Sequence, residues 1–297
     1  MKLNGRRRST NVDDRRGQGG FSLGRGTKVA GGGILGVIIA VAAVFLGGGD
    51  LGDVLGQLMG GGSGAGFGIN SSQSDYTPTQ EEEALAEFSE QIFAGTEDVW
   101  TEIFRQNGMT YEPPTLVLYT GSTTSGCGNA DASIGPFYCS ADQSVYIDLS
   151  FFQNMRRTLG ADGDFAYAYV IAHEVGHHVQ YLLGTLDEAH QQMSRLPESE
   201  ANKISVRLEL QADCYAGIWA YHDNKMFQSL EPGDIDEALD AASKIGDDYL
   251  QKKAQGYAVP DSFNHGTSAQ RHRWLQRGLR SGNPSDADTF SPAYSQL

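Results

Sequence analysis

Basic residues are scarce in most of this chain. Of its 297 residues, 22 are Lys or Arg and 37 are Asp or Glu, which gives a net charge of −15. The first 49 residues carry a net charge of +6, so the remainder carries −21. An acidic body of this kind repels phosphate backbones and argues against nucleic-acid binding, whereas it is compatible with a secreted or surface domain.

Charge of either sign is missing between Lys28 and Asp50. Residues 29–47 of this interval are about long enough to cross a hydrocarbon core of ~30 Å as a helix. Because the basic residues precede this segment, the positive-inside rule predicts a single-pass anchor in the inner (cytoplasmic) membrane. Residues 1–28 would then lie in the cytoplasm, and the acidic body in the periplasm or outside the cell.

Two other interpretations of this segment are less favoured. A cleaved signal peptide would end in a small-x-small site, and residues 46–50 form a poor one. A buried helix of a soluble domain would be weakened by the five glycines within residues 29–47. We therefore expect the chain to contact a lipid bilayer.

Cysteine is also scarce, with three residues in the chain. Cys127 and Cys139 lie in one loop rich in Gly, Asn and Asp, and in an oxidising compartment they would form a disulfide that stabilises by roughly 3 kcal/mol. In the reverse topology they would be free thiols or part of a second metal site. Cys214 lies in a helical stretch and is expected to be a small buried core residue.

Histidine is rare, with seven residues, yet two of them define the motif around which the sequence is organised. His173 and His177 form the pattern His-Glu-x-x-His. On a helix this spacing puts both imidazoles on one face, one turn apart, where they can bind one metal ion. Glu174 is offset around the helix and is better placed to take a proton from a zinc-bound water than to bind the metal. The alternative is a pair of core histidines beside a solvated glutamate.

The flanks of this motif predict a buried helix. Residues 165–171 are a largely apolar run, Asp164 is a candidate N-cap, and Gly184 can end the helix. His178 points about 100° away from its neighbour His177, and we expect it to pack or to support a ligand.

A catalytic zinc site needs a third protein ligand and an open position for water. Glu209 and Asp213 lie four positions apart in a stretch with helical character, residues 199–225, and share one face. We expect Glu209 to bind zinc and Asp213 to accept a hydrogen bond from the free ring nitrogen of a ligating histidine. Glu188 and Asp148 are the alternative ligands. An exposed acidic pair is less favoured because the neighbouring residues are apolar.

The remaining pattern predicts an α+β fold, in which a mostly helical domain over residues 77–282 carries a small β-sheet. A Gly/Ser-rich linker over residues 48–76 precedes this domain, and a loosely held polar tail over residues 283–297 follows it. Further helices are expected at residues 80–105, at 234–254 and from Thr267 or Ser268 to Leu279, and strands at residues 115–119 and 144–149. The second strand is expected at a sheet edge, either as an ordinary edge strand or as one that pairs with an extended substrate.

Several stretches together resemble the bacterial, membrane-anchored family called putative neutral zinc metallopeptidases, which is similar to the gluzincins. These stretches are Gly5-Arg6-Arg7 with Asn11-Val12-Asp13-Asp14-Arg15-Arg16, residues 135–139 running into 146–152, the two metal segments, and His265-Gly266-Thr267-Ser268 with Gln270-Arg271. The resemblance covers nearly the whole chain. It implies an anchored, extracytoplasmic peptidase domain with one Zn²⁺ ion.

Related gluzincins use a downstream His or Tyr to stabilise the oxyanion, and the resemblance implies that His265 has this role here. It lies in a turn directly before a capped helix, and an ordinary turn histidine is the alternative. His272, which lies within the helix between two arginines, is a weaker candidate. Arg271 is expected to pair with a buried carboxylate such as Asp213 rather than to touch substrate.

These features predict a zinc-dependent endopeptidase that cleaves peptide or protein substrates, with Glu174 as the general base. Two other classes stay open. One is a catalytically silent anchored scaffold with a structural zinc, and the other is a metallohydrolase that acts on small amides or cell-wall peptides. Glu174 argues against the scaffold, because a structural zinc site has no need of a base.

Overall fold

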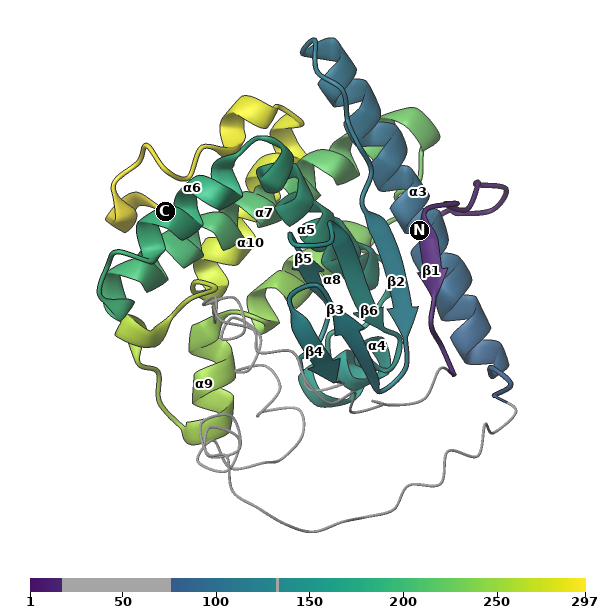
Figure 1. The fold of residues 1–297 in the computed structure, drawn as a ribbon, viewed down its shortest axis with the longest axis horizontal. Coiled ribbons are helices and arrows are strands. Elements are labelled where there is room, and N and C mark those ends of the chain that lie inside the picture. Colours follow the sequence, from purple (N-terminus) through teal and green to yellow (C-terminus); the bar gives the residue numbers. More distant parts are fainter. Residues whose placement is uncertain (18–75, 132–133) are drawn as a thin grey trace.

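A computed structural model of the chain describes residues 1–17, 76–131 and 134–297. These residues form an α+β fold, as predicted, in which helices pack against one face of a small sheet (Figure 1). The helices are α3 (Gln80–Gln106), α4 (Ser150–Asn154), α5 (Asp164–Leu182), α6 (Thr185–Met193), α7 (Glu198–Phe227), α8 (Asp234–Lys244), α9 (Asp247–Gln255) and α10 (Ser268–Ser281). The strands are β1 (Val12–Asp14), β2 (Thr115–Tyr119), β3 (Ser122–Ser125), β4 (Gly128–Asp131), β5 (Phe137–Cys139) and β6 (Ser144–Asp148).

The main sheet has the strand order β1-β2-β6-β5. Strands β1, β2 and β6 run parallel, and β5 runs antiparallel to β6. The expectation that residues 144–149 form an edge strand is therefore wrong, because β6 pairs on both sides. All five residues of β6 are buried, as a central strand requires. The edge on this side of the sheet is β5 instead.

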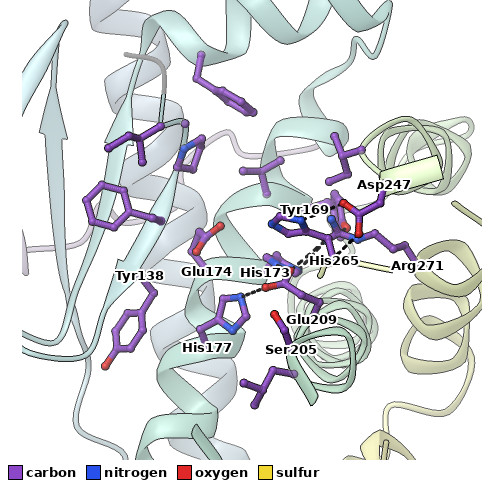
Figure 2. A pocket seen from close by; sticks show the side chains of 18 of the residues that line it. Tyr138, Tyr169, His173, Glu174, His177, Ser205, Glu209, Asp247, His265 and Arg271 are labelled. Carbon is purple, nitrogen blue, oxygen red and sulfur yellow. Dashed lines mark hydrogen bonds and ion pairs between the residues drawn. The ribbon is translucent and has the colours of Figure 1, made fainter. Parts of the chain in front are cut away.

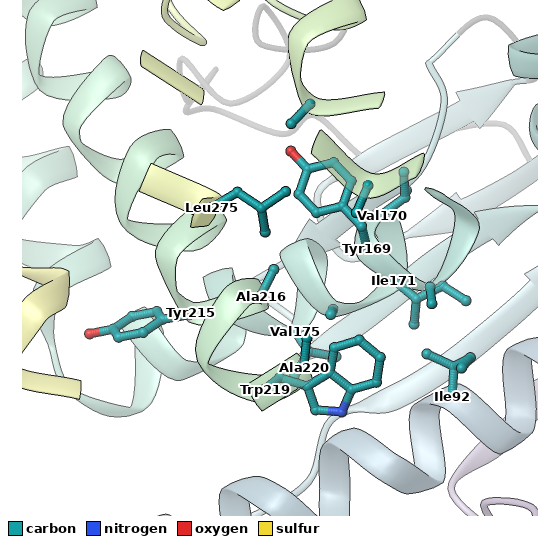
Figure 3. Close-up of a cluster of buried hydrophobic side chains, with 14 of the residues drawn as sticks. Ile92, Tyr169, Val170, Ile171, Val175, Tyr215, Ala216, Trp219, Ala220 and Leu275 are labelled. Atoms are coloured by element: carbon teal, nitrogen blue, oxygen red, sulfur yellow. The ribbon is translucent and has the colours of Figure 1, made fainter. Parts of the chain in front are cut away.

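The long helices agree with the hydrophobic periodicity. Helix α3 begins at a capping box between Thr79 and Glu82 and buries the face that carries Ile92, Val99 and Trp100. Helices α5 and α7 contain the two predicted metal segments, and they pack against each other in the main core. Figure 3 shows this core, with Val175 of α5 beside Trp219 of α7.

Small residues let three helices approach closely. A Cβ atom added to Gly176 of α5 would lie 3.1 Å from the Cα and carbonyl oxygen of Ala212 in α7. A Cβ atom added to Gly278 of α10 would lie 2.1 Å from the Cys214 carbonyl oxygen, which leaves no room for any side chain. Because Ala212 and Cys214 are two residues apart, these contacts place α5 and α10 on roughly opposite faces of the same segment of α7.

The predicted single helix over residues 234–254 is interrupted, so that α8 and α9 are separate. The break falls at Gly246, where an added Cβ atom would lie 2.3 Å from the Ser268 amide nitrogen. The chain must turn here because the start of α10 occupies the space. Glu237 in the first turn of α8 accepts a hydrogen bond from the Phe165 amide of α5, which ties the two helices together.

The C-terminal tail is packed rather than loose. Arg207 of α7 donates hydrogen bonds to the carbonyl groups of Thr289 and Pro292, and Leu297 is 3% exposed. The polar composition of residues 283–297 predicted a loosely held tail. The tail is held instead by its backbone carbonyl groups, which accept hydrogen bonds from the partly buried Arg207.

Cys127 and Cys139 form the predicted disulfide, and Cys214 is buried. Within the ranges that the structure describes, no helix is long and apolar enough to span a bilayer. The segment expected to do so, residues 29–47, and almost all of the expected linker lie outside those ranges.

The first seventeen residues, here called the N-terminal arm, belong to the same folded unit as the helical body. Strand β1 pairs with β2, and Arg6 forms a two-point ion pair with Asp223 of α7 at 2.9 and 2.6 Å. The side chain of Asp223 is fully buried and that of Arg6 is 9% exposed. The sequence instead predicts a separate basic segment over residues 1–28, because ion pairing with distant acids leaves no local signal.

The arm makes a first prediction about stability. Arg6→Ala leaves the buried Asp223 carboxylate without its cation, so it should lower the free energy of unfolding by about 3–5 kcal/mol. Arg8 pairs with Glu87, and both side chains are about half exposed, so Arg8→Ala should cost less than about 1 kcal/mol. Urea denaturation of the two variants measures the difference. Equal, small losses would show that the arm does not contribute to the fold.

Candidate metal centre

Three side chains from two helices converge on one point. His173 and His177 lie one turn apart on α5, and Glu209 lies on the facing turn of α7 (Figure 2). The Glu209 carboxylate is 3.2 Å from His173 Nε2 and 3.5 Å from His177 Nε2. The crossing at Gly176 makes this possible, because a larger residue there would hold the two helices apart.

The three side chains fit a zinc ion. Ligand atoms around tetrahedral zinc with bonds of roughly 2.0–2.1 Å lie about 3.4 Å apart, which agrees with the separations of 3.2 and 3.5 Å. The ligand atoms of all three residues lie within 4.8 Å of one another. The set of ligand types is also suitable, since two neutral imidazoles and one carboxylate are typical of catalytic zinc.

Each histidine presents its Nε2 atom to the centre because its Nδ1 atom is engaged elsewhere. His173 Nδ1 donates to Asp213 Oδ1 at 2.8 Å, and His177 Nδ1 donates to the Gln180 side-chain oxygen at 2.9 Å. Gln180 is held in turn by its bond to the Leu208 carbonyl at 2.7 Å. These contacts fix both the ring orientation and the tautomer that a metal ligand needs.

Asp213 is the hub of a buried network. Besides His173 it accepts hydrogen bonds from the Tyr169 hydroxyl at 2.5 Å and from Arg271 Nε and Nη2, both at 2.9 Å. Arg271 therefore pairs with Asp213 as expected. Both side chains are almost wholly buried, and the arginine lowers the pKa of the carboxyl group despite the opposing effect of burial.

The electrostatics of the centre favour a positive charge. Burial on its own would lower the pKa of the His173 imidazole, but Asp213 and Glu209 raise it to about 10. Burial on its own would raise the pKa of Glu209, but the neighbouring histidines together have the larger, opposite effect. The pKa is therefore below its ordinary value, and the group stays ionised. Two buried carboxylates beside two imidazoles thus provide the potential in which a divalent cation is stable.

Glu174 lines the same pocket as the three metal-binding candidates, but it does not take part in their cluster. Its side chain is largely buried, and among the residues that the structure describes none forms a hydrogen bond or ion pair with its carboxylate. A buried carboxylate without a protein partner normally costs free energy. Here the carboxylate faces a cavity, so water or substrate can be its partner.

His265 also lines this pocket, in the turn before α10. Asp247 holds the turn, because its Oδ2 atom accepts the backbone amides of Asn264, His265 and Gly266 at 2.8, 2.7 and 3.0 Å. Its Oδ1 atom lies 3.2 Å from His265 Nδ1, which leaves Nε2 available to the pocket. Burial would lower the pKa of His265, but Asp247 raises it above its ordinary value.

The pocket around these groups has a volume of about 170 Å³. On one side it is lined by the edge strand β5 and the residues before it, from Gly135 to Tyr138. Beyond the metal-binding candidates the lining is mainly apolar and includes Phe151, Leu159, Val170, Ile245 and Leu250. The centre thus lies between a strand edge and an apolar recess.

Other candidates lie apart from the centre. Asp148 is buried and accepts the amides of Gly121 and Ser150, and Glu188 is exposed on α6. His178 is buried between the Tyr138 hydroxyl and the Glu112 carbonyl, and burial lowers its pKa to about 4. It therefore supports the packing of α5 against β5, and neither it nor His272 lines the pocket.

Sequence reasoning missed three supporting residues. Gln180 lies one turn after His177, and this helical spacing was the available signal. Tyr169 lies one turn before His173, where its hydroxyl reaches Asp213. Asp247 had no local signal, because its partners begin seventeen residues further along the chain.

Comparison with known proteins identifies a family whose description fits a zinc site. A family model described as putative neutral zinc metallopeptidase matches residues 1–290. The uncharacterized protein YpfJ of Escherichia coli (strain K12) is 47% identical over 295 residues, which cover 98% of this chain and 99% of that protein. The uncharacterized protein Rv2575 of Mycobacterium tuberculosis is 44% identical over 193 residues, which cover 62% of this chain and 64% of that protein. No solved structure matches.

The geometry predicts one bound zinc ion per chain. Glu209→Ala removes the only carboxylate in the three-residue cluster and should lower zinc affinity by about a hundredfold or more, because two imidazoles alone hold the ion weakly. Glu188→Ala removes an exposed acid and should leave affinity unchanged. Competition with a chromophoric chelator measures both affinities. Unchanged affinity in the Glu209 variant would exclude it as a ligand.

Proposed function

The chain belongs to the family of putative neutral zinc metallopeptidases, and from this premise we propose that it is a zinc-dependent endopeptidase with Glu174 as its general base. The observation that carries the proposal is the Glu174 carboxylate in the pocket, which has no hydrogen-bond or ion-pair partner within residues 1–17, 76–131 and 134–297 and lies beside three residues that could hold a metal ion. A structural zinc site is closed by four protein ligands and needs no such group.

The catalytic roles follow from where the side chains lie. Bound zinc would lower the pKa of a water molecule and polarise the peptide carbonyl group. Glu174 takes the proton from the attacking water and passes it to the departing amine, since no residue in the described part of the chain engages its carboxylate. His265 donates from Nε2 to the carbonyl oxygen as negative charge develops there, and Asp247 keeps its imidazole oriented and protonated.

The pocket wall indicates how a peptide is held. The edge strand β5 can pair through its backbone with an extended substrate, and such pairing accepts many sequences. The apolar recess supports a preference for a large apolar side chain next to the cleaved bond, because burying such a side chain favours binding by about 1.5–3 kcal/mol. Both features favour peptides over small amides.

Two alternatives lead to different observations. A catalytically silent scaffold would bind zinc without cleaving anything, and a hydrolase of small amides or cell-wall peptides would ignore ordinary peptides. Digesting a peptide library with the purified protein, with and without a zinc chelator, separates the endopeptidase from both alternatives. The endopeptidase should produce chelator-sensitive internal cuts, enriched for large apolar residues on one side of the cleaved bond. Absence of any cut would contradict the endopeptidase and leave the scaffold and the small-amide hydrolase.

The role of Glu174 predicts a separation of binding from catalysis. Glu174→Gln keeps the size of the side chain but cannot accept the proton, so turnover should fall by about 10²- to 10⁴-fold. Zinc content should stay at the parent level because Glu174 is not in the ligand cluster. Casein cleavage and metal analysis test both points. Parent-rate cleavage by this variant would refute the general-base role.

The role of His265 predicts a loss of activity and a shift in its pH dependence. His265→Ala should lower turnover about 10²- to 10³-fold with little change in zinc content. Because Asp247 raises the pKa of His265, Asp247→Asn should lower it, and the alkaline limb of the kcat/KM profile should move to lower pH.

A matched control separates this role from a general effect of removing histidine. His272→Ala, four residues into α10, changes a histidine that does not line the pocket and should retain parent activity. Loss of zinc from the His265 variant, or an unchanged alkaline limb in the Asp247 variant, would contradict the donor role.

A further inference from the structure

The N-terminal arm is joined to the body by backbone hydrogen bonds. Residues of β1 pair in parallel register with β2, Val12 with Leu116 and Asp14 with Leu118. The ladder extends beyond the strand at both ends, since the Leu116 amide donates to the Asn11 carbonyl at 2.8 Å and the Arg15 amide donates to the Leu118 carbonyl at 2.7 Å. Figure 1 shows β1, in purple, lying between β2 and α3.

Side chains of the arm form ion pairs and hydrogen bonds with acidic residues of the body. Glu97 of α3 is 5% exposed, and its carboxylate binds Arg7 at 2.8 Å, Ser9 at 2.6 Å and Asn11 at 2.8 Å. Asp223 of α7 is fully buried against Arg6. Within the described residues 1–17, five arginines pair with acids of the arm or the body: Arg6, Arg7, Arg8, Arg15 and Arg16.

The body is incomplete without these contacts. Removing the arm would leave Glu97 and Asp223 as buried carboxylates without a cation, which folded proteins avoid. It would also expose β2 as an unpaired edge next to its buried, apolar residues. The arm therefore has to be present in the compartment where the body folds.

We infer that the N-terminal arm and the helical body lie on the same side of any membrane. A single crossing would put about 30 Å of hydrocarbon between β1 and β2. Docking of the arm onto a second copy would meet the same barrier. This inference is independent of the peptidase activity.

The positive charge of the N-terminal arm has a structural role in this fold. The positive-inside rule treats basic residues as free charges that stay in the cytoplasm. Here the guanidinium groups of Arg6 and Arg16 are largely buried and bind carboxylates. Arginines of the arm therefore serve as ion-pair partners for acids of the body, and their charge on its own does not assign an orientation.

Cysteine labelling of the full chain in bacterial cells tests the inference. Thr10→Cys marks an exposed position of the arm, and Arg273→Cys marks an exposed position of α10. A membrane-impermeant maleimide is applied to spheroplasts before and after lysis, with the parent chain as the baseline. Both positions should label at the same stage, either both before lysis or both only after it. Labelling of one position before lysis and of the other only after lysis would overturn the inference.

Hydrogen exchange on the purified full chain provides the second measurement. The Arg15 and Leu116 amides should exchange on the order of 10³-fold or more slowly than unstructured amides. Arg6→Ala should accelerate both, whereas Arg8→Ala should not. Fast exchange at both amides in the parent chain would show that the arm is undocked, and would overturn the inference even if both cysteines label together.

Discussion

The close crossing of α5 and α7 is the constraint on which the rest of the centre depends. Gly176 lies against Ala212, so the helices approach until backbone and side-chain atoms touch. Residues within one turn of the crossing then face each other, which brings His173 and His177 to Glu209. The metal site is thus a result of helix packing, and the free energy that orders it comes from the core around it.

Buried hydrogen bonds around the three candidate ligands fix the orientation of the histidine rings. Asp213 and Gln180 each take one ring nitrogen, so the other nitrogen of each histidine is directed to the centre. Arg271 balances the charge of Asp213 inside the core. Glu174 is left outside this network and faces the cavity. The histidine side chains are held by hydrogen bonds, whereas no described residue binds the Glu174 carboxylate. This difference favours a catalytic over a structural role for the site.

The sequence predicted the parts of this arrangement that are periodic or local. Helical spacing located both metal segments, and the pairing of Arg271 with Asp213 followed from their charge and apolar setting. Contacts between distant segments could not be predicted in this way. Asp247 reaches the His265 turn only through the fold, and β5 becomes the edge strand only because β6 pairs on both sides. The break between α8 and α9 likewise depends on the neighbouring start of α10.

Three side chains should hold one zinc ion in this protein, with a fourth position open for water. X-ray absorption at the zinc edge of the purified full-length protein measures the ligands of the ion. The spectrum should show two imidazole nitrogens at about 2.0–2.1 Å, carboxylate oxygen, at least one further oxygen from water, and no sulfur. A zinc ion closed by four protein ligands, or one bound through sulfur, would contradict this expectation.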